Sequence, residues 1–230
     1  MALSRRNLST GLLLWFVTWV IMPAQVEPPA ARQLLFSVFA AEPVGRLCYV
    51  AKPGTAPERL EFYPTVRSPL YLYEGPSRVQ FLDVDTAAIR AEFTVPPRIR
   101  RVLLILAHDN AARTGPIQYR VLILDDSAQR HDTGTIRILN LSGLELSGTI
   151  NLRSVTLQGG ADEIVQVGNT AVIHLRTPYH NRTYQAYAET LSIEHSGSAF
   201  LLLLPPYRPG SLEVQSRFLA EAPVARPQSR

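Results

Sequence analysis

The chain of 230 residues is 46% hydrophobic and 18% charged, a composition that favours a globular fold over a disordered one. Its formal net charge is +4, and half of that excess lies in the first 40 residues, so charge gives no support to a nucleic-acid-binding surface. The length suits one large domain or two small ones.

The N-terminus has the parts of a secretory signal: two arginines, an apolar run over residues 11–22, and then a proline. The apolar run of about 12 residues is shorter than the roughly 18 to 20 that cross a bilayer. We therefore predict that residues 1–40 are a signal peptide and leader, and that the protein is exported to the periplasm or beyond. Cleavage after Ala24 and cleavage after Ala40 are both open, and an uncleaved anchor is the alternative.

Cys48 is the only cysteine. An exported chain with one cysteine has no internal disulfide, so its fold must depend on core packing. We expect Cys48 to be a buried strand residue between two apolar neighbours.

After the leader, short apolar or alternating runs follow one another, separated by turns that contain Pro and Gly. Such spacing is typical of an all-β sandwich, whereas a parallel sheet would need long helical stretches between the strands. Only residues 86–90 hint at a helix, of about one turn. The strands predicted in the first half are residues 46–50, 59–62, 69–73, 78–84, 92–95, 102–106 and 119–124.

The stretch over residues 100–126 is the centre of this pattern. Its two runs, residues 102–106 and 119–124, are continuously apolar, which favours central strands covered on both faces. A buried helix is the competing interpretation, but a core helix needs about 10 residues or more.

The pattern begins again after residue 133. Regular alternation over residues 212–219 predicts one apolar face and one face in contact with water. The strands predicted in the second half are residues 135–141, 147–152, 154–157, 163–167, 171–176, 184–193, 200–204 and 212–219.

The two halves share an order of events at offsets of about 91 to 98 residues, which predicts a tandem repeat. We expect two immunoglobulin-like β-sandwiches at residues 42–127 and 133–220, with a disordered tail at residues 221–230. The alternative is that any two all-β halves look alike. The matched segments are residues 46–50 with 137–141, 69–75 with 162–168, 78–83 with 171–176, and 102–124 with 200–219.

Candidate catalytic groups gather around the loop that follows residue 106. They are His108, Asp109 and Asn110, with Asp126 and His131 further along. Turns recruit Asp and Asn for backbone reasons alone, and no nucleophile motif such as Gly-x-Ser-x-Gly accompanies them. We therefore predict no catalytic residues and no enzyme, and keep His108, Asp109 and Asn110 as candidate ligand or partner contacts because long loops carry binding sites.

Metal and cofactor sites are not predicted. The histidines at positions 174, 180 and 195 do not pair at a zinc spacing, and no glycine-rich phosphate loop is present. Tyr71 and Tyr73 share one face of a predicted strand and form a candidate platform for a glycan or peptide, because tyrosine combines an apolar ring with a polar end. A pair that merely covers the sheet is the simpler interpretation.

The sequence thus predicts an exported, non-catalytic interaction or structural module. We expect its partner to be another cell-envelope protein, bound through a sheet edge or the groove between the two sandwiches, with no nucleic acid involved. A glycan- or peptide-binding protein is the first alternative, and a hydrolase with an unrecognised site is the second.

Overall fold

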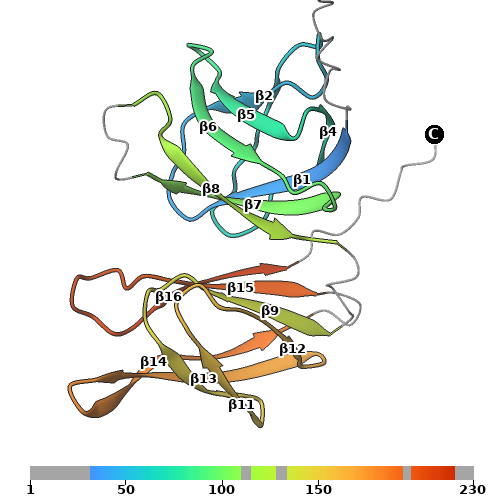
Figure 1. Ribbon diagram of the computed structural model, residues 1–230. Coiled ribbons are helices and arrows are strands. Elements are labelled where there is room, and N and C mark those ends of the chain that lie inside the picture. The colour runs from blue at the N-terminus through green and yellow to red at the C-terminus, as the bar shows by residue number, and fades with distance from the viewer. Residues whose placement is uncertain (1–31, 110–114, 128–133, 194–197, 221–230) are drawn as a thin grey trace, which may run out of the picture.

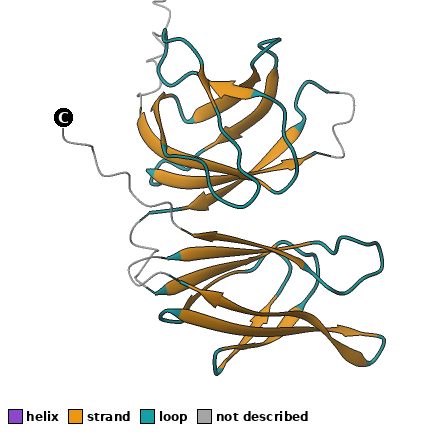
Figure 2. Ribbon diagram, turned by 180° about the vertical axis from the view of Figure 1, so that it is seen from behind, coloured by secondary structure: helices purple, strands orange, loops and turns teal. Residues whose placement is uncertain are grey.

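The computed structural model describes residues 32–109, 115–127, 134–193 and 198–220 (Figure 1). Every regular element in these ranges is a β-strand, which confirms the all-β prediction (Figure 2). Within the same ranges there is no helix with the length and apolar character needed to cross a membrane. Residues 1–31 of the predicted signal peptide and leader, and the predicted tail, lie outside the described residues.

The first unit, residues 32–127, forms two four-stranded sheets. Their strand orders are β4-β1-β7-β8 and β3-β2-β5-β6. The strands are β1 (Arg32–Ala40), β2 (Leu47–Tyr49), β3 (Glu58–Arg59), β4 (Tyr71–Gly75), β5 (Arg78–Asp83), β6 (Ile89–Thr94), β7 (Arg101–His108) and β8 (Tyr119–Asp125).

The second unit, residues 134–220, repeats this topology. Its sheets have the orders β12-β9-β15-β16 and β11-β10-β13-β14, which are those of the first unit shifted by eight strands. The strands are β9 (Thr135–Asn140), β10 (Leu146–Ile150), β11 (Arg153–Leu157), β12 (Asp162–Gln166), β13 (Thr170–Tyr179), β14 (Arg182–Ser192), β15 (Ala199–Leu204) and β16 (Gln215–Ala220).

The four sheets are stacked as layers (Figures 1 and 2). One apolar core lies between the two sheets of each unit, and a third lies between β1-β7-β8 of the first unit and β9-β15-β16 of the second. The two inner sheets are therefore covered on both faces. Side chains that face the neighbouring unit include Phe39, Leu103, Ile105, Phe200 and Leu202.

Burial on both faces confirms the prediction for residues 102–106, each of which is buried in β7. For residues 119–124 the prediction was wrong, because β8 is an edge strand in which only Tyr119 and Leu124 are buried and the other residues are partly or fully exposed. The alternation over residues 212–219 predicts Glu213, Gln215 and Arg217 on the face in contact with water, and these side chains are exposed or partly exposed. Leu219, which follows Arg217 on that face, is instead buried against the first unit.

The strand β1 was missed by the sequence interpretation. It lies at the centre of its sheet, antiparallel to β4 and parallel to β7, just as β9 lies between β12 and β15. The range 1–40 assigned to the leader thus overlaps nine residues of core strand. Pro28 and Pro29 precede this strand and could have marked its start.

Missing β1 also shifted one matched pair in the predicted repeat. Residues 46–50 contain β2, whose counterpart in the sheet order is β10, whereas residues 137–141 belong to β9, the counterpart of β1. The other three matched pairs fall on corresponding strands: β4 with β12, β5 with β13, and β7-β8 with β15-β16.

The predicted helical turn at residues 86–90 is not a helix: residues 84–86 form a turn closed by the Ala87 N–H, which donates to the carbonyl of Asp83 over 2.9 Å, and β6 begins at Ile89. Asp83 organises it, because its carboxylate Oδ1 accepts the backbone N–H groups of Asp85 at 3.0 Å and Thr86 at 2.9 Å. Cys48 is buried within β2, as expected, and burial raises the pKa of its thiol, with a smaller contribution from Asp83.

Candidate functional site

The two tyrosines predicted as a platform point toward the core of the first unit, so their shared face is the buried one. Tyr73 is buried there, and its hydroxyl donates to the backbone carbonyl of Arg78 over 3.3 Å. Tyr71 is half-buried, its ring centre lies 5.4 Å from that of Phe36, and its hydroxyl accepts the backbone N–H of Glu61. Both rings therefore serve the fold.

Tyr71 also lines a shallow cavity of about 290 Å³ beside the end of β2. The charged groups of this cavity largely satisfy one another: Lys52 lies 3.5 Å from Glu74, and Glu58 accepts the hydroxyl of Tyr49 over 3.0 Å. Burial, followed by the contact with Glu58, raises the pKa of Tyr49, so this hydroxyl remains a neutral donor.

The loop candidates do not converge on a reaction centre. His108 Nε2 lies 3.1 Å from the carbonyl oxygen of Pro43. The centre of its ring lies 4.9 Å from that of Tyr119, and the two rings are tilted by 50°. His108 pairs with Tyr119 at one end of the β7–β8 hairpin, whereas Asp126 follows the opposite end. Asp109 donates its backbone N–H to Gln118. Asn110 and His131 lie outside the described residues.

Asp126 has a clear structural role. It is 1% exposed, and its carboxylate accepts hydrogen bonds from Arg67 Nη1 at 3.0 Å and Arg101 Nε at 3.0 Å. A carboxylate this deeply buried needs such partners, because removing a charge from water costs several kcal/mol. The group therefore ties the loop before β4 to β7.

Metal binding has no structural support in the described part of the chain, where no three His, Cys, Asp or Glu side chains are arranged to hold an ion. His174 lies on β13, and His180 occupies the turn between β13 and β14 with a positive φ of 45°.

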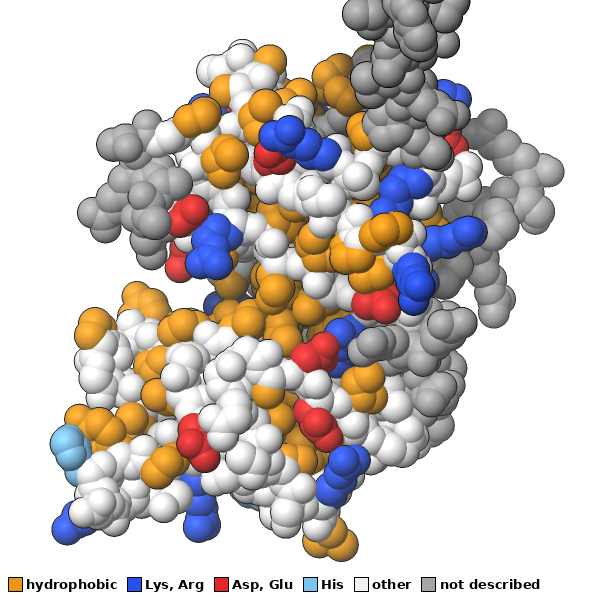
Figure 3. All heavy atoms as spheres, viewed as in Figure 1, with side chains coloured by type: hydrophobic (Ala, Val, Ile, Leu, Met, Phe, Trp, Pro, Cys, Tyr) orange, Lys and Arg blue, Asp and Glu red, His pale blue; other side chains and the backbone are white. Residues whose placement is uncertain are grey.

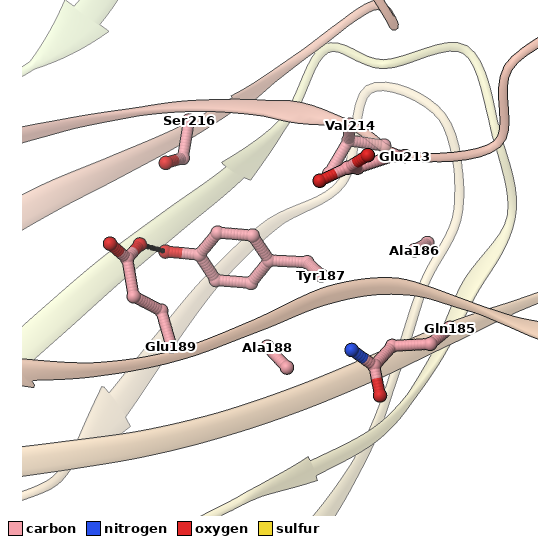
Figure 4. Close-up of a pocket in the computed structure, with 8 residues that line it drawn as sticks. All are labelled: Gln185, Ala186, Tyr187, Ala188, Glu189, Glu213, Val214 and Ser216. Carbon is pink, nitrogen blue, oxygen red and sulfur yellow. Dashed lines mark hydrogen bonds between the residues drawn. The ribbon is translucent and has the colours of Figure 1, made fainter.

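A polar concavity lies in the second unit, in the mouth between the edge strands β14 and β16 (Figure 4). It has a volume of about 500 Å³. Its lining residues are Gln185, Ala186, Tyr187, Ala188, Glu189, Glu213, Val214 and Ser216. We call this concavity the edge groove.

The position of the edge groove follows from a β-bulge. Leu175 pairs with Tyr187 and Arg176 with Gln185, so Ala186 is an extra residue in β14. Its carbonyl turns away from β13 and accepts the backbone N–H of Val214 over 3.0 Å. This bond joins the two sheets at the end of the groove.

The first unit has the same device. Arg90 is the extra residue of a bulge in β6, and its carbonyl accepts the backbone N–H of Gln118 over 2.8 Å. Gln118 and Val214 each precede the last strand of their unit. The repeat thus extends from strand order to an individual backbone hydrogen bond between the sheets.

The side chains beside the two bulges differ. Counting from the bulge residues, Ala91 and Phe93 of the first unit correspond to Tyr187 and Glu189 of the second. Ala91 and Phe93 fill the core of the first unit, whereas Glu189 is exposed in the edge groove. The fold alone therefore does not require a polar mouth at this position.

Tyr187 and Glu189 form the floor of the edge groove. Tyr187 is 8% exposed, and its hydroxyl donates to Glu189 Oε2 over 2.5 Å (Figure 4). Burial, followed by this hydrogen bond, raises the pKa of Tyr187, so the hydroxyl stays protonated and holds the carboxylate in place. Glu213 adds a second carboxylate at the rim.

The outer edge of β14 borders the same groove. Ile193 donates its backbone N–H to the carbonyl of Asn169 on the side of β13. Because the N–H and C=O groups of successive residues point to opposite sides of a strand, those of Ala188 and Thr190 point away from β13. No backbone hydrogen bond joins these groups to another described residue. At eleven residues, β14 is the longest described strand, and it is an edge strand.

Sequence reasoning did not select Tyr187, Glu189 or Glu213. The repeat contained the signal: when the two bulges are aligned, Glu189 of the second unit takes the position of the core residue Phe93 in the first. An alignment by apolar runs could not reveal it, because a bulge changes the side-chain parity within a strand.

No protein-family model and no curated protein sequence matches this chain.

Proposed function

We propose that this protein is an exported, non-catalytic interaction module of the cell envelope, built from two tandem immunoglobulin-like sandwiches, and that it binds a partner polypeptide through a sheet edge. The observation that carries the proposal is the edge of β14, which borders a cavity of about 500 Å³. Long edge strands are normally shortened, covered or interrupted, because their free backbone groups recruit other strands. Extended peptides commonly use such edges.

The stacking of the units favours an edge over the space between them. Phe39, Leu103 and Phe200 are buried in the core between the inner sheets. A partner could not enter there without separating the units, which would expose this apolar surface at a cost of about 25 cal/mol per Å².

Export is proposed from the N-terminal pattern, in which arginines precede the apolar run at residues 11–22. A fold with one buried cysteine and no disulfide among the described residues is compatible with an oxidising compartment, because no free thiol is presented on its surface.

Site-specific photo-crosslinking of the full chain in intact cells tests this function. A photoreactive residue at Ala188 lies on the free edge, and one at the fully exposed Leu152 serves as the control. We expect an adduct of defined mass from position 188 alone. If neither position 188 nor any other edge strand yields an adduct, the interaction function is contradicted.

Glycan binding is a second candidate, favoured by the cavity of about 290 Å³ beside Tyr71. Exposed Leu70 and Leu72 line the same cavity and offer an apolar surface on which a sugar could stack. Calorimetric titration with soluble envelope oligosaccharides tests it. Loss of the heat signal in Leu72→Asp, with no change in Leu152→Asp, is the expected result.

A further inference from the structure

We infer that the edge groove accepts an extended, basic segment of a partner polypeptide, which adds as a strand to β14 and places a Lys or Arg side chain between Glu189 and Glu213. This inference rests on the function proposed above and names the chemistry of the partner. It depends on three properties of the groove: its free backbone edge, its charge and its difference from the first unit.

The backbone edge supplies the affinity that is independent of sequence. The outward groups of Ala188 and Thr190 recur every second residue, which is the spacing that an added strand requires. Both side chains are exposed and small enough to leave the edge accessible. The bond between Val214 and Ala186 closes the groove at one end, so an added strand would pair with β14 beyond Ala186.

Charge selects the partner. No Lys or Arg of the described residues lies within salt-bridge distance of Glu189 or Glu213, although arginines pair with Asp83, Asp85, Glu92, Asp126, Asp162 and Glu163 elsewhere. The basic residues of the two strands, Arg182 and Arg217, do not line the groove. A guanidinium or ammonium group is the complement that this lining lacks.

The first unit shows that the polar mouth is specific to the second. Phe93 occupies the position of Glu189 and packs on Phe81 at 5.2 Å. In the first unit, the same bulge and the same bond between the sheets thus occur where apolar side chains fill the space between the edge strands. The carboxylate in the second unit is therefore not a requirement of the repeat.

Two capped nine-residue peptides serve as probes, one alternating lysine with threonine and the other alternating glutamate with threonine. Fluorescence anisotropy measures their binding to the full chain at low and high salt. We expect the lysine peptide to bind at least tenfold more tightly and to weaken with salt. Because the chain itself carries a net charge of +4, general attraction would favour the glutamate peptide.

Variants locate the site. The pair Glu189→Gln and Glu213→Gln keeps the acceptor for the Tyr187 hydroxyl and should together weaken the lysine peptide roughly tenfold, as expected for two exposed ion pairs. Glu163→Gln, which removes a partly exposed carboxylate on β12, is the matched control and should leave the affinity for the lysine peptide unchanged.

Thr190→Pro removes an outward N–H and should abolish binding, because proline is tolerated only where the ladder does not need the donor. A lysine peptide methylated on alternate backbone nitrogens removes the complementary bonds, in which the peptide N–H groups donate to the outward carbonyls of β14, and it needs no change in the protein if Thr190→Pro does not fold.

A roughly tenfold loss of affinity on charge removal, together with loss of binding on backbone blocking, supports the inference. An affinity that stays unchanged after either change, or no binding of the lysine peptide at all, overturns it. If an adduct at Ala188 still forms in cells while the lysine peptide does not bind, the proposed function stands and only the basic partner is wrong.

Discussion

The guanidinium carbon of Arg67 lies 4.9 Å from the centre of the Phe200 ring, although the two residues belong to different units. Arg137 approaches the same ring at 5.4 Å, and its Nη1 donates to the backbone carbonyl of Asp125 in the first unit. Phe200 itself is fully buried in the core between the inner sheets. The contact between the units therefore combines apolar packing with cation–π and hydrogen-bond contacts.

Phe200→Ala should destabilise the protein by about 3 to 5 kcal/mol, because it leaves a cavity in the core shared by the two units. Urea unfolding followed by circular dichroism measures the loss. Tyr207→Ala, at a residue that is 84% exposed, is the control and should stay within about 0.5 kcal/mol. Equal effects of the two substitutions would mean that the units do not stabilise each other.

Asp126→Ala should cost about 3 to 5 kcal/mol, because it removes the carboxylate that compensates buried Arg67. The paired control is Asp85→Ala, whose exposed ion pair with Arg46 contributes at most about 1 kcal/mol. Chemical denaturation of both variants at pH 7 compares them. A loss in Asp126→Ala no larger than that in Asp85→Ala would contradict the structural role of this carboxylate.

The Asp83 carboxylate should make stability depend on acid pH. Hydrogen bonds from Thr86, with further contributions from Asp85 and Arg90, lower its pKa in the folded state. Because the folded pKa is lowered, the ionised carboxylate stabilises the folded protein at pH values above the unfolded pKa of about 3.9. This stabilisation is lost as the pH falls through the folded pKa. Asp83→Asn should therefore lower the urea midpoint at pH 7, and this deficit should shrink as the pH falls below about 3.9. A pH-independent deficit would assign the effect to packing instead.

Gly148→Ala should be destabilising by about 1 to 3 kcal/mol or more. A Cβ at this position in β10 would lie 1.9 Å from the carbonyl oxygen of His174, so the backbone of β13 would have to move. Gly159→Ala is the matched control, because its nearest neighbour would be at 3.7 Å. Thermal melting of the two variants should separate them by several degrees.

If the protein is exported as proposed, its mature form should retain Arg32. Cleavage after Ala40 would remove β1, the strand that lies between β4 and β7, whereas cleavage after Ala24 would leave it intact. Intact mass spectrometry of the secreted form measures the N-terminus. A mature chain that begins at Ala41 would contradict the sheet order of the first unit.

Patterns along the chain were enough to predict the class of structure and most of the strands. Alternation and apolar runs depend only on which neighbours along the chain are apolar, so they predicted fifteen of the sixteen described strands to within a few residues. The run at residues 102–106 even indicated burial on both faces, because a strand with one wet face cannot be apolar throughout.

Which faces of the sheets pack against each other depends on tertiary structure. The parallel pairing of β1 with β7 joins residues more than 60 positions apart, and the covering of Leu219 by the first unit depends on how two sheets stack. The edge groove depends on a bulge at Ala186, which leaves no periodic trace in the sequence. Local patterns record whether a side chain is buried, whereas the identity of the partner that buries it is set by long-range pairing.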